Sequence, residues 1–282
     1  MRKTLVLLVA AASLWPVAGH AAEEWTRTYT VHGQPAVSLG ADDGSIEVRP
    51  GPAGQVSIHV TTRGFRAGEL RVVERQDGNR IHYEVREPHL RWGFSYGQRG
   101  VRIEVTVPHT LDLVVGTGDG AISVSDLEGH LVLKTGDGNL QAEALKGDIE
   151  LGTGDGDIRA RGLEGHLGVH SGDGTVEVAG RFDALRAGSG DGSMAVEALE
   201  GSAVETPWVL STGDGPITLR LADDFRADLD AHTGDGSIDL QVPVEILGHF
   251  GTDHRNVRGR IHGGGGLLQL STGDGPIRIE AR

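Results

Sequence analysis

The sequence contains no cysteine, few aromatic residues and, beyond its first 21 residues, no long apolar run. The absence of cysteine excludes disulfide bonds and an anchor attached through a cysteine. Phe, Trp and Tyr make up only 4% of the 282 residues. No run after residue 21 approaches the roughly 18 apolar residues that a membrane-spanning helix needs. We therefore expect no transmembrane segment in the mature chain.

Residues 1–21 have the composition of a secretory signal peptide. Two basic residues precede an apolar run from Leu5 to Leu14, and small residues stand at positions −3 and −1 of a cleavage point before Ala22. The pattern predicts export to the periplasm or the cell surface. A chain without cysteine fits either place, because repeated strand pairing can supply the stability that disulfides give small secreted domains.

The balance of charge is acidic, with a formal net charge of −14 at pH 7. Phosphate backbones and anionic lipid surfaces attract basic proteins, so we expect no nucleic-acid partner. No phosphate-binding loop, haem motif or Ser-His-Asp set is present, and we expect no cofactor and no catalytic residues.

Glycine is abundant, with 45 residues, and much of it falls in a regular repeat. The triplet Gly-Asp-Gly recurs every 18 residues, starting at positions 118, 136, 154, 172 and 190. A fixed period of this size is typical of a solenoid, in which each repeat buries its apolar face against its neighbours. Glycine at both ends of the triplet suits a tight turn repeated in register.

Between the triplets, apolar residues alternate in two pairs that are out of phase, as in Ile122 and Val124 followed by Leu131 and Leu133. A continuous strand cannot keep both pairs on one face. Each coil should therefore consist of two short strands and two bends, with a leucine such as Leu127 inside one bend. The sequence thus predicts an all-β fold, a parallel β-solenoid with 18-residue coils, over residues 111–282.

An N-terminal β cap with a degenerate first coil is expected over residues 22–110. Its strands are predicted at Gln55–Thr61, Glu69–Glu74, Arg80–Arg86 and Val101–Val107. Such a cap would cover the open end of the solenoid. After residue 192 the triplets recur at wider intervals, which predicts the same coils with longer loops and a final half-coil at Ile277 and Ile279.

The aspartates of the triplets form the sharpest candidate site. Stacked about 4.8 Å apart, their carboxylates would repel one another. Calcium could bridge them, which is the basis of a candidate metal column. The alternative is that each aspartate bonds a backbone N–H of its own turn. The candidate residues are Asp119, Asp137, Asp155, Asp173, Asp191, Asp214, Asp235 and Asp274.

A hydroxyl residue precedes each triplet, from Thr117 to Thr272. This column could bind ice or polysaccharide if it were exposed, or form a hydrogen-bonded ladder at the strand ends.

Two loops carry further candidates. Arg91, Trp92, Phe94 and Tyr96 lie in a glycine-punctuated stretch with the composition of an interaction site, although they could instead cover the core of the cap. The second loop, residues 241–266, contains His249, Asp253, His254 and His262 at spacings that match no common metal motif.

The run Val101–Pro108, followed by Leu111–Leu113 and the Gly-Asp-Gly units, resembles a bacterial β-strand-repeat family, domain of unknown function 4097 (DUF4097). The segment from Val257 to Gly275 is similar to its closing unit. The resemblance implies an exported β-solenoid with an adhesive or cell-envelope role. It carries no catalytic residues.

We therefore expect a non-enzymatic adhesin or binding scaffold whose partner is a protein or glycan of the cell envelope. One alternative is a polysaccharide-processing enzyme on the same coil, although the acids are spread evenly and not gathered into a pair. Another is a calcium-stabilised surface repeat protein.

Overall fold

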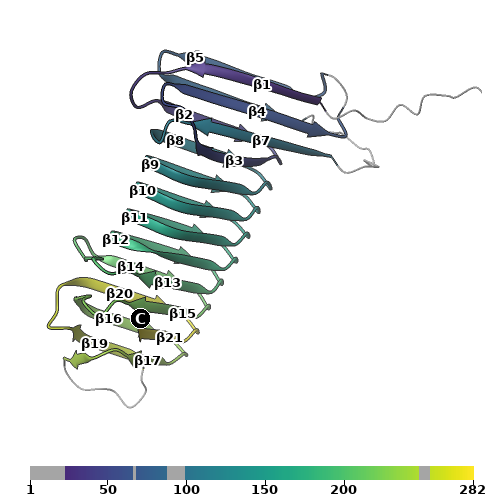
Figure 1. The fold of residues 1–282 in the computed structure, drawn as a ribbon. Coiled ribbons are helices and arrows are strands. Elements are labelled where there is room, and N and C mark those ends of the chain that lie inside the picture. Colours follow the sequence, from purple (N-terminus) through teal and green to yellow (C-terminus); the bar gives the residue numbers. More distant parts are fainter. Residues whose placement is uncertain (1–22, 66–67, 88–98, 248–254) are drawn as a thin grey trace, which may run out of the picture.

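The computed structural model describes residues 23–65, 68–87, 99–247 and 255–282, and these residues form strands, turns and loops without a helix. The all-β class is confirmed. Figure 1 shows the strands stacked in successive layers, from the N-terminal strands at one end to β17 and β19 at the other. The described residues contain no helix that could cross a membrane.

Four parallel strands of 14 residues form the middle of the stack. In the first three, paired residues are 18 positions apart, as Leu140 is from both Ile122 and Ile158. Alternate side chains point inward and are buried, and they form one hydrophobic core along the stack. The four strands are β9 (Ile122–Thr135), β10 (Leu140–Thr153), β11 (Ile158–Ser171) and β12 (Val176–Ser189).

Each of these strands turns a corner without losing its pairing. In β9 the turn lies between Asp126, with φ 55°, and Gly129, with φ 141°, while Leu127 is buried inside it. The two short strands predicted for each coil are therefore wrong in one respect, because a single bent strand replaces them. The reason is geometric: the ladder bonds run to neighbouring coils, parallel to the stack, so a bend around the stack leaves most of them intact.

The Gly-Asp-Gly triplets form the opposite corner, where successive coils approach closely. A Cβ atom on Gly138 would lie 2.0 Å from the carbonyl oxygen of Gly120 in the preceding coil. The hydroxyl of Thr135 donates toward the carbonyl oxygens of Gly118 and Gly120, at 3.1 and 2.9 Å, and accepts from the Gly138 amide at 3.2 Å. The hydroxyl column is thus the predicted hydrogen-bonded ladder. An ice- or glycan-binding role is wrong for it, because Thr135 and its equivalents are largely buried.

At the N-terminal end, β2 (Ala36–Ala41) and β3 (Ser45–Pro50) stack in parallel on β8 (Thr110–Thr117) and β9. The next layer consists of β6 (Arg80–Arg86) on β2 and β7 (Gly100–Val107) on β3. Three antiparallel strands then end the stack: β5 (Arg71–Asp77), β4 (Gln55–Arg63) and β1 (Glu23–Thr30). The four strands predicted in this region are confirmed to within three residues at each end.

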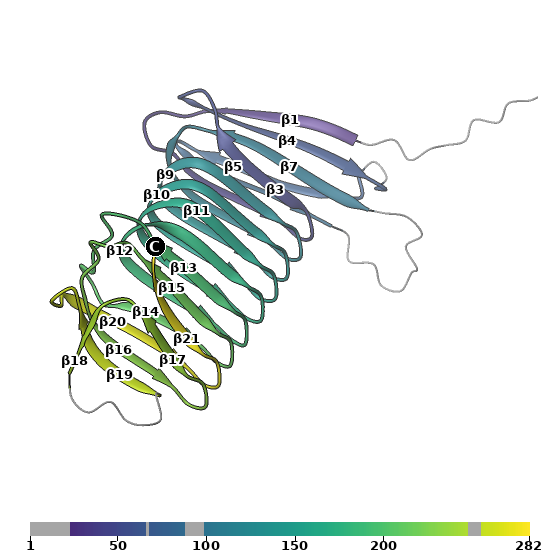
Figure 2. The ribbon, with the colours of Figure 1, turned by 60° about the horizontal axis from the view of Figure 1, so that its bottom comes forward.

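At the C-terminal end, the order of the coils differs from the order of the chain. The coil formed by β20 (Gly266–Thr272) and β21 (Ile277–Ala281) lies between the coil of β14 (Trp208–Thr212) and β15 (Ile217–Leu221) and that of β16 (Ala227–Thr233) and β17 (Ile238–Gln241). Figure 2 shows β21 between β15 and β17. The predicted half-coil at the end of the stack is therefore wrong. That end is instead covered by antiparallel β19 (Asn256–Ile261) and β18 (Val244–Ile246).

An aromatic cluster fills the wider C-terminal coils, where longer loops replace the leucine corner. Trp208 is fully buried, and its ring lies 6.1 Å from that of Phe182 and 5.0 Å from that of Phe225. Its indole N–H is buried without a hydrogen-bond partner among the described residues. The few aromatic residues thus supply bulk where the repeat is irregular.

Candidate functional site

The eight aspartates of the corner column are all exposed. Within the described ranges only Asp235 has a partner, the guanidinium of Arg255 at 3.3 Å, and the side chains of the other seven have no hydrogen bond or ion pair. No group of three acidic or imidazole side chains converges on one point in the described part of the chain. The calcium column therefore stays a prediction without support from side-chain geometry.

The two candidate loops fall largely outside the described residues. Arg91, Trp92, Phe94 and Tyr96 lie there, as do His249, Asp253 and His254. His262 is described, and its Nδ1 lies 2.9 Å from the carbonyl oxygen of Phe225, so it serves the turn after β19.

An acidic group marks the N-terminal end of the corner column. The backbone amide of Glu87 donates to a carboxylate oxygen of Asp42 at 2.7 Å. Burial raises the pKa of the Glu87 carboxyl, and the neighbouring charges of Asp43 and Asp42 raise it further. Two of these acids belong to the degenerate first corner, Asp42 to Gly44, so the end of the column concentrates negative charge.

A candidate binding site lies on the outer face of the strand segments that follow the leucine bend. We call it the central groove. It has a volume of about 810 Å³ and runs across β9, β10, β11, β12 and β14. Its outward-facing polar and charged side chains are those of Lys134, Glu150, His170, Arg186 and Ser211, and the buried hydroxyl residues Thr135 and Thr153 also border it. Sequence reasoning missed it, because its residues are scattered over separate repeats.

Three glycines form the floor of the central groove: Gly152, Gly168 and Gly188. None has a positive φ, and a Cβ atom on any of them would meet its nearest neighbour at 3.4 Å or more. Neither turn geometry nor packing therefore requires glycine here. Glycine weakens the interior of a strand and often marks a place where a ligand or another backbone comes close.

The glycines and the larger side chains alternate in a chequered pattern. Along one column of paired residues, Gly168 separates Glu150 from Arg186. Along the next column, Gly152 separates Lys134 from His170. Each large side chain therefore borders a bare stretch of backbone, which produces a recess between upright charged groups.

The charges of the groove are only partly paired within the protein. The ammonium of Lys134 lies 2.7 Å from a carboxylate oxygen of Glu150. Arg186 and His170 are exposed and have no hydrogen bond or ion pair among the described residues. Two cations and one carboxylate line the groove, so it is locally positive on an acidic protein.

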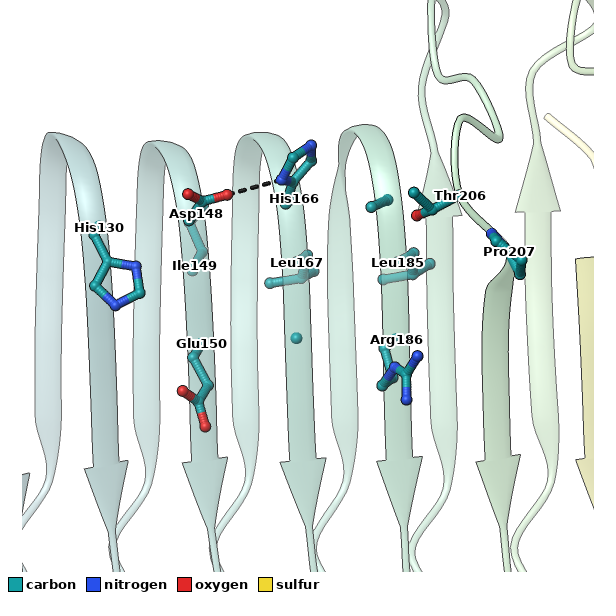
Figure 3. Close-up of a pocket in the computed structure, with 12 residues that line it drawn as sticks. His130, Asp148, Ile149, Glu150, His166, Leu167, Leu185, Arg186, Thr206 and Pro207 are labelled. Atoms are coloured by element: carbon teal, nitrogen blue, oxygen red, sulfur yellow. Dashed lines mark hydrogen bonds and ion pairs between the residues drawn. The ribbon is translucent and has the colours of Figure 1, made fainter. Parts of the chain in front are cut away.

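A second, smaller pocket of about 330 Å³ adjoins the groove and shares Glu150, Gly168 and Arg186 with it. Figure 3 shows His166 pointing toward Asp148 across neighbouring strands, with Nδ1 and Oδ1 2.8 Å apart. Both side chains are more than half exposed. An exposed pair on an open surface lacks the enclosed setting in which a catalytic acid and base are usually held.

The stack of parallel coils makes this chain a β-solenoid-like protein. Within that class it belongs to the Toastrack DUF4097 family, whose profile matches residues 36–280. The family resemblance seen in the sequence is confirmed.

Solved structures with a related fold include a candidate lipid-binding protein from Parabacteroides distasonis ATCC 8503. It aligns at 14% identity and a TM-score of 0.52, over 91% of this chain and 96% of its own. A candidate adhesin from Bacteroides fragilis NCTC 9343 aligns at 12% identity and a TM-score of 0.45, over 91% and 97% respectively. At 14% identity the likeness to the first of these shows the fold alone. No curated protein matches the chain.

Proposed function

We propose that this protein is exported, is not an enzyme, and acts as an adhesin or binding scaffold of the cell envelope. In this role a parallel β-solenoid of 18-residue coils presents a binding surface on its middle coils, between the antiparallel strands at its two ends. The observation that carries the proposal is the central groove, in which three glycines that the fold does not require lie among charged side chains. Export rests on the composition of residues 1–21.

A scaffold role fits the physical character of the stack. Its core is continuous, and its inward side chains are almost all apolar. A second outer face is formed by the strand segments that precede the leucine bend and by their equivalents, such as β15 and β21. On this face opposite charges lie on neighbouring coils, as with Arg220 and Glu280 at 3.1 Å. A rigid surface of this kind loses little conformational entropy when a ligand binds.

The enzyme alternative, a polysaccharide-processing activity, rests on the exposed pair of Asp148 and His166 beside the groove. The two readings differ in what happens to a bound polymer. A binding scaffold returns it intact, whereas an enzyme shortens it or releases product.

The test uses the chain from residue 22 onward, titrated with purified envelope glycans and envelope proteins while polymer length is monitored. Gly152→Leu fills the groove floor. Gly116→Leu is the matched control, because Gly116 lies in the same column on β8, outside the groove, with open space around it. We expect binding without turnover, lost in the first variant and kept in the second. Turnover that depends on His166 would replace the proposal with the enzyme, and equal binding by both variants would contradict it.

A further inference from the structure

We infer that the central groove binds an acidic glycan, with the carboxylates of uronic acid units held by Arg186 and His170. This inference rests on the proposed function and names the class of ligand for the same site. It is argued from the charge of the groove, the pairing of its backbone, and its length.

Charge favours an anionic ligand. The protein as a whole is strongly acidic, yet the lining of the groove contains Lys134, Arg186 and a single carboxylate, Glu150, which is already bonded to Lys134. Gly168 keeps Arg186 two strands away from Glu150, a separation of roughly 9.6 Å at the usual strand spacing. The guanidinium of Arg186 is therefore available to a ligand. Its planar N–H donors match the two oxygens of a carboxylate.

The backbone of the groove argues against a peptide ligand. An extended polypeptide commonly binds to a sheet by adding a strand to a free edge. The floor residues are instead inside the sheet, since Gly168 is paired on one side with β10 and on the other with β12. A peptide would find no free ladder here. A sugar needs none, because its hydroxyls can bond to the side chains of the rim.

The walls also argue against a lipid chain. Leu151 and Val169 belong to the lining, but both are buried and face the core. The upright side chains are charged or polar apart from Val209. A bare glycine floor exposes flat peptide surface, on which the C–H face of a sugar ring can lie while its hydroxyls reach the rim.

The length of the groove favours a polymer over a single sugar. It extends from Lys134 on β9 to Ser211 on β14, across five strands, which is roughly 19 Å at four strand spacings. A chain of sugars lying along the stack would cross successive coils and meet Arg186 and His170 on adjacent strands.

The experiment measures binding of polygalacturonate, alginate and hyaluronan by calorimetry, each beside the same polymer with its carboxyl groups reduced to alcohols. The variants are Arg186→Gln, His170→Gln and Gly152→Leu. Arg161→Gln is the charge control, because Arg161 is exposed, has no ion pair among the described residues, and lies on the other outer face of β11. Gly116→Leu is the bulk control.

We expect at least one of the acidic polymers to bind, and its reduced form to bind at least tenfold more weakly. Arg186→Gln should weaken binding roughly tenfold, Gly152→Leu should abolish it, and the two controls should leave it unchanged. Binding should also weaken as salt is added.

Equal binding of a reduced polymer, or equal effects of Arg161→Gln and Arg186→Gln, would overturn the inference. If Gly152→Leu still blocked a neutral glycan or an envelope protein in the preceding test, the binding scaffold would stand and only the ligand class would be wrong. Failure of all three acidic polymers would also refute the inference. Failure of every envelope ligand would remove both proposals.

Discussion

Glycine occurs in two regions of this protein for opposite reasons. At the corner, Gly156 faces the carbonyl oxygen of Gly138, and a Cβ atom would lie 2.0 Å from it. On the outer face, Gly168 has the same neighbouring coil beneath it, yet a Cβ atom would find its nearest contact at 3.8 Å. The corner needs glycine in order to stack, whereas the face tolerates a side chain and lacks one. The difference separates residues that hold the coils together from residues that leave room for something else.

The largest effect should come from placing one methyl group in each region. Gly156→Ala should lower the free energy of unfolding by at least about 3 kcal/mol or prevent folding, because backbone of the adjacent coil cannot move aside. Gly168→Ala should change it by no more than about 0.5 kcal/mol. Denaturant unfolding of both variants measures the contrast. Similar losses in the two variants would break the comparison.

The next effect concerns the hydroxyl that locks the corner. Thr153→Val should destabilise the fold by about 1–3 kcal/mol, since it leaves the carbonyl of Gly138 and the amide of Gly156 without their buried partner. Thr153→Ser is the control, because Ser171 occupies the equivalent place in the next coil. Thermal unfolding measures the stability of each variant. Equal stability of Thr153→Val and the natural protein would refute the role of the hydroxyl.

A pH-dependent effect is expected where the corner column ends at the N-terminal layers. The pKa of Glu87 is raised in the folded state by burial and by Asp43 and Asp42, so the ionised carboxylate costs stability above that raised pKa. The cost fades as pH falls from that raised pKa towards the ordinary glutamate value, about 4.3, and is absent below it. Glu87→Gln should therefore stabilise the protein at neutral pH and not at pH 3. Unfolding curves at both values test this, and a gain independent of pH would contradict it.

The smallest effect should come from the exposed aspartates. The midpoint of thermal unfolding should be the same in EDTA and in millimolar calcium, because in the described residues no three acidic side chains converge on one point. Asp155→Asn should raise the midpoint slightly at low salt by relieving repulsion along the column, and this gain should shrink as salt is added. A clear rise with calcium, lost in Asp155→Asn, would instead support the predicted metal column.

Much of the fold could be predicted from the sequence, because each coil repeats one local pattern. The alternation of Ile122 and Val124 placed both side chains inside, as the structure has them, and the strands near Gln55 and Val101 followed from the same rule. The order of the last coils could not be predicted. The last three units carry the same Thr-Gly-Asp-Gly corner, so Gly213 can accept either Gly234 or Gly273 as its neighbour, and only the loops and the antiparallel strand β19 decide between them.

The candidate site was harder to find for a related reason. The corner glycines are easy to recognise because they recur at a fixed period. The glycines on the outer face of the strands do not stand out beside them. Gly152, Gly168 and Gly188 could be recognised from sequence only by asking which glycines lie inside a strand, on its outward positions, with no turn to explain them. The charges around them come from three different repeats, and only the register of the stack brings them together.

The interposed coil of β20 and β21 also governs how the protein can be assembled as it emerges from a ribosome or a translocation channel. The early coils can stack as they are made, since each rests on a coil that lies earlier in the chain. The coil of β16 and β17 has no such predecessor, because its parallel neighbour is made of residues 266–281, which arrive later. Until those residues are made, β14 and β16 each have an unpaired edge. Such an edge can pair with the wrong strand. The N-terminal part can thus form vectorially, while the C-terminal part must close in a single late step.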